Sequence, residues 1–172
     1  DKTRITLKID ISTGDVITPC EISFSYQLMF ENRTIPLLAY PPETVLAEKL
    51  ETILSRGEAN TRLRDFYDVY ILQREDFVVT PDALRYALLA TCRTRGHEDL
   101  LHTYASILDG VRQSGAMRTQ WMKYQTDFDY AAGITWDTVL DTVETLCMKT
   151  LDDHAFGDEL PQEESQFEMH LL

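Results

Sequence analysis

The sequence of 172 residues contains no hydrophobic run as long as a membrane span, which needs about 20 consecutive apolar residues. It also opens without a signal peptide, because Asp1-Lys2-Thr3-Arg4 leads directly into an alternating segment. We therefore expect a cytoplasmic protein without a membrane partner.

Cysteine and histidine are scarce. The three cysteines, Cys20, Cys92 and Cys147, are far apart, odd in number and form no C-x-x-C motif. This excludes a disulfide framework or a zinc site and fits buried thiols in a reducing compartment. His97 and His102 are five residues apart, so they do not lie on one helix face as a pair of metal ligands at i and i+4 would.

Basic residues are few: 16 Lys and Arg face 29 Asp and Glu, which gives a net charge of −13. Such a surface repels nucleic acid as a whole, so contact with RNA would require a local basic patch or a bound metal ion. Residues 152–172 contain acids but no Lys or Arg, and we expect a solvated acidic tail there.

The first forty residues are β-like. Residues 4–11 alternate strictly, with apolar side chains at the odd positions and Asp10 on the opposite, polar face near the end of the segment. A second alternating run spans 22–30, and a short third one spans 35–40, where Pro36 indicates an edge strand. A carboxylate on the open face of a sheet could hold a metal ion or accept a proton.

Beyond residue 41 the period becomes helical. The predicted fold class is α+β: a small N-terminal sheet followed by a bundle of about six helices in residues 42–151. Pro42 suits a helix start and Gly57 a helix stop, whereas Gly115 is predicted as a break. The predicted helices span 43–56, 62–73, 81–93, 97–113, 117–128 and 135–151.

Two helices carry candidate functional groups. Lys49 lies at the margin of the apolar stripe of the first helix, where it could project its ammonium into a cleft or simply reach the surface. On the second helix, Asp65 and Asp68 are one turn apart, and Arg64 can pair with Asp68. These acids could orient Lys49 or hold substrate; the structural alternative is an ion-paired helix that joins the β and α parts.

The order of these sites and the local sequence around them resemble those of a known family. The segments LKIDISTGDVITP and YPPETVLAEKLETILSRGEANTRLRDFYDVYIL are similar to the later motifs of the AbiEii/AbiGii nucleotidyltransferase toxins of bacterial toxin–antitoxin and abortive-infection systems, which act in phage defence. The resemblance covers residues 5–73 closely and the helical remainder loosely. It implies that residues 1–41 are the last strands of a nucleotidyltransferase core.

The resemblance also implies the chemistry. A nucleoside triphosphate (NTP) would lose pyrophosphate while its nucleotide moves to an acceptor such as tRNA, with Mg²⁺ and a cognate antitoxin as further partners. Asp10 would be the third carboxylate and a metal ligand, and Lys49 and Asp65 would complete the catalytic set. Arg64 and Asp68 would bind substrate.

One departure limits this expectation. The family pattern places Gly-Ser and Asp-x-Asp upstream of the third carboxylate, but only nine residues precede Asp10, and the Asp-x-Asp at 127–129 lies in the wrong context. We expect a piece of a longer chain that is inactive in isolation. The alternative from another class is a non-catalytic helical module that binds a protein partner.

Overall fold

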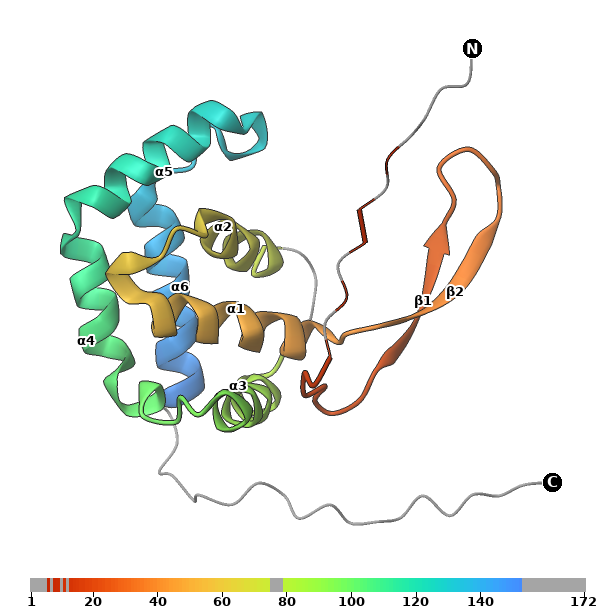
Figure 1. Ribbon diagram of the computed structural model, residues 1–172, viewed down its shortest axis with the longest axis horizontal. Coiled ribbons are helices and arrows are strands. Elements are labelled where there is room, and N and C mark those ends of the chain that lie inside the picture. The colour runs from red at the N-terminus through yellow and green to blue at the C-terminus, as the bar shows by residue number, and fades with distance from the viewer. Residues whose placement is uncertain (1–5, 7, 10, 12, 75–78, 153–172) are drawn as a thin grey trace.

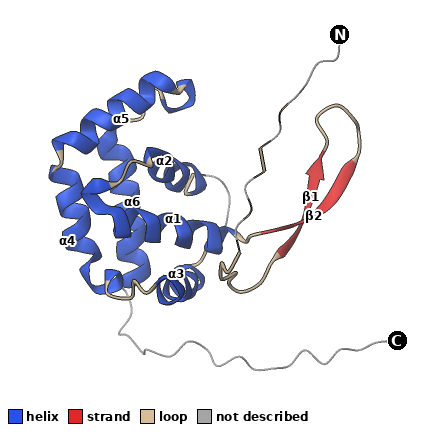
Figure 2. Ribbon diagram, in the orientation of Figure 1, coloured by secondary structure: helices blue, strands red, loops and turns tan. Residues whose placement is uncertain are grey.

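The computed structural model describes residues 6, 8–9, 11, 13–74 and 79–152. They form a two-stranded antiparallel sheet followed by six α-helices, which confirms the predicted α+β class (Figures 1 and 2). The helices are α1 (Pro42–Arg56), α2 (Leu63–Leu72), α3 (Pro81–Arg95), α4 (Leu100–Gln113), α5 (Gly115–Asp127) and α6 (Trp136–Leu151). None of the helices in the described part is long and apolar enough to cross a membrane.

The sheet is a hairpin that projects from the helical body (Figure 1). Strand β1 (Ile22–Gln27) pairs with β2 (Thr34–Ala39) in a register that sets Ile22 opposite Ala39 and Phe24 opposite Leu37. Alternation therefore collects apolar side chains on one face, as predicted, but within the described residues this face stays open: Phe24 is 51% exposed.

The predicted strand at 4–11 is wrong for the residues of that segment that are described. Thr6, Lys8, Ile9 and Ile11 belong to no strand, and Ile9 and Ile11 are exposed. Alternation marks a segment that suits a sheet, but a strand forms only where a neighbouring strand satisfies its backbone hydrogen bonds. Asp10 lies outside the described residues.

Helix α1 crosses the middle of the bundle and packs against α2, α3 and α4, while α6 packs against α2, α3, α4 and α5 (Figure 1). The core side of α1 contains four of the five residues of the predicted apolar stripe, Leu46, Leu50, Ile53 and Leu54, together with Ala47. The fifth, Val45, is only half-buried. Gly57 ends α1 with a positive φ of 48°, which glycine adopts without steric cost.

The predicted helix boundaries hold to within a few residues, with two instructive differences. The predicted break after residue 113 is present, but it falls at Ser114, and Gly115 is already the first residue of α5. Ser114 Oγ accepts a hydrogen bond from Met117 N and so starts the helix. Helix α4 begins at Leu100, three residues later than predicted, and His97 contacts α1 instead of extending the helix.

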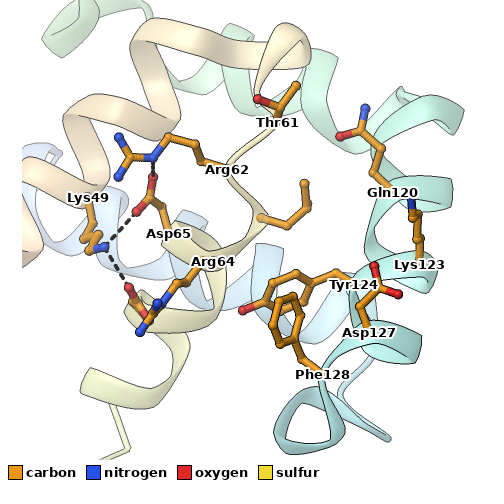
Figure 3. Close-up of a pocket in the computed structure, with 12 residues that line it drawn as sticks. Lys49, Thr61, Arg62, Arg64, Asp65, Gln120, Lys123, Tyr124, Asp127 and Phe128 are labelled. Carbon is orange, nitrogen blue, oxygen red and sulfur yellow. Dashed lines mark hydrogen bonds and ion pairs between the residues drawn. The ribbon is translucent and has the colours of Figure 1, made fainter. Parts of the chain in front are cut away.

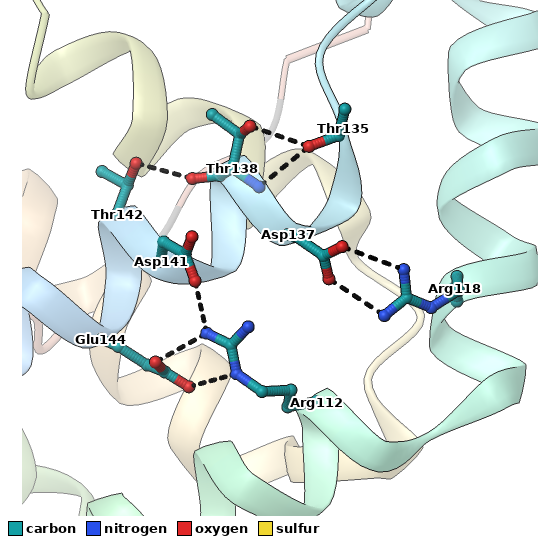
Figure 4. Close-up of polar contacts among 8 residues, drawn as sticks. All are labelled: Arg112, Arg118, Thr135, Asp137, Thr138, Asp141, Thr142 and Glu144. Atoms are coloured by element: carbon teal, nitrogen blue, oxygen red, sulfur yellow. Dashed lines mark hydrogen bonds and ion pairs between the residues drawn. The ribbon is translucent and has the colours of Figure 1, made fainter.

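Two arginines fasten α4 and α5 to α6 (Figure 4). Arg112 on α4 donates from Nε and Nη2 to Glu144, at 3.0 and 2.6 Å, and from Nη2 to Asp141. Arg118 on α5 makes a two-pronged contact with Asp137, at 3.3 and 2.9 Å. This geometry fixes the orientation of both helices, because a guanidinium and a carboxylate match in plane and spacing.

The three thiols should differ sharply in reactivity. Cys20 is exposed, whereas Cys92 and Cys147 are fully buried, and burial raises the pKa of each to about 12. Since the thiolate is the reactive form, we expect one fast-reacting thiol per native chain and three after denaturation. Titration with a chromogenic disulfide measures both numbers.

The matched control for this titration is Cys20→Ser, which should abolish the fast phase. Fast labelling of Cys92 or Cys147 in the native protein would contradict the packing of α3 and α6 described here.

Candidate functional site

The centre of the site is an ion-pair cluster between α1 and α2. Lys49 Nζ lies 2.7 Å from Asp65 Oδ1 and 2.7 Å from Asp68 Oδ2 (Figure 3). Arg62 Nε lies 3.0 Å from the other oxygen of Asp65, close enough for an ion pair but without the direction of a hydrogen bond. Lys49 of the first predicted helix is thus in direct contact with both acids of the second, Asp65 and Asp68.

Helix geometry explains how the cluster forms. Lys49 lies beside the buried stripe of α1 and reaches toward α2 with its side chain 22% exposed. Asp65 is in the first turn of α2, where the positive end of the helix dipole favours a carboxylate, and it is only 2% exposed. Asp68 follows one turn later on the same face, so both acids point at one ammonium.

The electrostatics keep Lys49 charged. Burial of the ammonium acts to lower the pKa of Lys49, but hydrogen bonds and attraction from Asp65 and Asp68 outweigh it and raise the pKa above its ordinary value. Lys49 is therefore a fixed cation at neutral pH rather than a proton acceptor.

Beside the cluster lies a cavity of about 620 Å³, here called the nucleotide-sized cavity (Figure 3). One wall, here called the charged wall, comes from α1, α2 and the residue before α2, and it carries Lys49, Asp65, Asp68 and the arginines 62 and 64. The opposite wall is one face of α5, with Gln120, Lys123, Tyr124, Asp127 and Phe128. The α5 side, here called the aromatic wall, thus adds two aromatic rings to one ammonium and one carboxylate, across a space that would hold a ligand the size of a nucleotide.

The aromatic wall is rigidly supported. Tyr124 stacks on Trp121, which is buried and donates from Nε1 to the carbonyl of Ile134 at 2.8 Å. Burial, together with a hydrogen bond to Tyr130, raises the pKa of Tyr124, so its phenol stays neutral. Tyr124 can therefore offer a flat apolar surface but no base.

Arg64 pairs with Asp68 as the i,i+4 spacing predicts, although loosely, at 3.8 Å and with 76% of its side chain exposed. An exposed guanidinium at the rim of a cavity is free to turn toward an anionic ligand. The structure thus brings together four of the five candidate residues, Lys49, Arg64, Asp65 and Asp68. The fifth, Asp10, lies outside the described residues.

Sequence reasoning missed a second cluster on the other side of α1. Glu51 is buried and is shared by Arg95 at the end of α3 and by His97, whose Nδ1 lies 2.6 Å from Glu51 Oε1. The signal was present: Glu51 falls at i+4 from Ala47 and i−3 from Leu54, so it lies on the buried stripe of the helix. A carboxylate there requires a partner from elsewhere in the chain.

The described residues do not form a metal centre. They contain no group of three His, Cys, Asp or Glu arranged to hold a metal ion. Of the three acids that line the cavity, Asp65 and Asp68 already face the ammonium of Lys49, which competes with any metal ion for the same oxygens.

A family model matches most of the chain. Residues 1–142 match a family model described as nucleotidyl transferase AbiEii toxin, type IV TA system. Neither a curated protein nor a solved structure matches the chain significantly.

Proposed function

The chain belongs to the AbiEii family of nucleotidyl transferase toxins of type IV toxin–antitoxin systems, and on this premise we propose that its nucleotide-sized cavity binds the NTP donor. The reaction moves the nucleotide from the donor to an acceptor such as tRNA, in the cytoplasm and under the control of a cognate antitoxin that limits toxicity during phage defence. The observation that carries the proposal is the Lys49 ammonium, held between Asp65 and Asp68 at the edge of this cavity.

Each candidate site residue that the structure describes has a proposed role that follows from its surroundings. Lys49 contributes positive charge against the triphosphate, and Asp65 and Asp68 hold the Lys49 ammonium in place. The Asp65 carboxylate can lie near phosphate because Lys49 and Arg62 balance its negative charge. Arg64 binds a terminal phosphate from the rim. The rings of Tyr124 and Phe128 lie 4.7 Å apart and provide a surface on which a base can stack.

These roles fit an in-line displacement. A hydroxyl of the acceptor attacks the α-phosphorus and loses its proton to a carboxylate, for which we propose Asp10. A new phosphorus–oxygen bond forms, and the bond between that phosphorus and the bridging oxygen breaks to release pyrophosphate. Positive charge near the triphosphate stabilises the departing pyrophosphate, and positioning by fixed side chains removes the entropic cost of alignment.

The family suggests a divalent metal, typically Mg²⁺, but the described acids do not fit such a centre and we assign them no step through it. Asp10 remains our proposed metal ligand, outside the described residues. No Gly-Ser turn with an Asp-x-Asp precedes it in these 172 residues, and we therefore propose that they do not catalyse transfer on their own.

Binding of donor tests the proposal without requiring turnover. The chain should bind NTPs, and inorganic tripolyphosphate should compete, because the charged wall recognises phosphate. Arg64→Ala should weaken NTP binding by about tenfold, the value of one charge-assisted contact of roughly 1.5 kcal/mol. Isothermal titration calorimetry measures the NTP affinity of the parent chain and of Arg64→Ala.

Arg33→Ala, in the turn of the exposed hairpin, is the matched control that removes one arginine far from the cavity. It should bind NTPs as the parent chain does. Absence of NTP binding by the parent chain would contradict the assignment of this cavity as the donor site and would favour the alternative of a non-catalytic helical module that binds a protein partner.

A further inference from the structure

We propose that a second cavity, on the other side of the Lys49–Asp65 pair, binds the phosphodiester backbone of a nucleic-acid acceptor. The inference rests on the proposed function and adds the residues that would hold the acceptor. This cavity, here called the polar cavity, has a volume of about 370 Å³ and extends along the second half of α1 toward Arg95.

The two cavities share a wall. Lys49, Arg62 and Asp65 line both of them, so the ion-pair cluster lies between the cavities. A donor in one cavity and an acceptor in the other would meet at the same ammonium. Transfer requires that arrangement, because the acceptor hydroxyl must approach the α-phosphorus from a side that the donor does not fill.

The lining of the polar cavity suits a sugar-phosphate backbone and not a base. It contains the hydroxyls of Thr52 and Ser55 and the guanidinium of Arg56, and no aromatic residue. The nucleotide-sized cavity, in contrast, has Tyr124 and Phe128. Bases are held by stacking on aromatic rings, whereas backbone phosphates are held by arginine and hydroxyl groups.

Each acid that lines the polar cavity lies in an ion pair with a cation of the protein, and the lining holds four cations and three acids. Arg95 pairs with buried Glu51 and lies 3.8 Å from Glu48, while Lys49 and Arg62 balance Asp65. Arg95 is also 4.0 Å from Asp15, and Lys49 is shared with Asp68, so one cation of the lining is left that no described acid engages.

That cation is Arg56, in the last turn of α1. It is exposed and makes no ion pair with any residue that the structure describes. A free guanidinium beside two hydroxyls gives a protein of net charge −13 a local site for a phosphate, which the overall charge alone would disfavour.

The experiment measures binding of a labelled single-stranded RNA oligonucleotide by fluorescence anisotropy at several salt concentrations. Arg56→Ala should weaken RNA binding several-fold and reduce the slope of log affinity against log salt by about 0.7, the value for one phosphate contact on a single strand. NTP affinity should stay unchanged, because Arg56 does not line the nucleotide-sized cavity. Arg33→Ala, which removes the same charge from the hairpin, should leave RNA binding unaltered.

Equal RNA affinity and salt slope for Arg56→Ala and Arg33→Ala would overturn this inference, as would a parent chain that binds no RNA. The NTP measurement tests the donor site separately. If the parent chain binds no NTP but binds RNA in a way that depends on Arg56, the donor assignment is overturned and the polar cavity remains a phosphodiester site.

Discussion

Replacing Lys49 with methionine should reduce nucleotidyl transfer by the full-length protein about 100- to 1000-fold, the usual effect of removing one preorganised charge from a reacting centre. Methionine keeps the apolar stem of lysine along α1 but removes the ammonium that lies 2.7 Å from Asp65 and from Asp68. The measurement is release of labelled pyrophosphate together with incorporation of labelled nucleotide into RNA.

Two further variants separate charge from geometry. Lys49→Arg keeps the charge but presents a wider, planar group, and it should recover only part of the activity because a guanidinium does not fit between the two carboxylates as an ammonium does. Lys149→Met, on the exposed face of α6, removes one ammonium elsewhere and should retain full activity. Transfer by Lys49→Met within threefold of the parent rate would show that Lys49 has no catalytic role; this bound is about 0.6 kcal/mol of barrier.

Asp65→Asn should lower the free energy of unfolding by about 3 kcal/mol, the lower end of the range for breaking a buried ion pair. The asparagine has the same shape, but its amide would place N–H donors against the ammonium of Lys49 or the guanidinium of Arg62, where a carboxylate now lies. We choose the lower end because both cations keep some solvent contact, which screens them. Urea denaturation followed by circular dichroism gives the value.

Asp68→Asn is the matched control one turn along the same helix. Its side chain is 24% exposed and we expect a loss below about 1 kcal/mol, as is usual for solvated ion pairs. In the double variant Lys49→Met with Asp65→Asn, the loss should be smaller than the sum of the two single losses, because each change removes the partner that the other leaves unpaired. Strict additivity would mean that the contact between Lys49 and Asp65 contributes nothing to stability.

The sequence determined the helical part of this protein because helices depend on local interactions. A backbone hydrogen bond in a helix joins residues four apart, so the apolar period, Pro42 at a start and Gly57 at an end fix α1 without knowledge of the rest of the chain. The same locality placed Lys49 on the edge of a buried stripe and Asp65 and Asp68 on one face of α2.

Tertiary structure decided which of these groups meet and what surrounds them. The partners of Glu51 lie 44 and 46 residues away, and the aromatic wall opposite Lys49 comes from α5, far along the chain, so no spacing rule could predict either. The alternating segment at 4–11 fails as a strand in its described residues for the same reason: sheet hydrogen bonds need a second strand, and alternation alone does not supply one. The sequence thus determined the candidate groups, and the packing of α1, α2 and α5 decided that the described ones among them line one cavity.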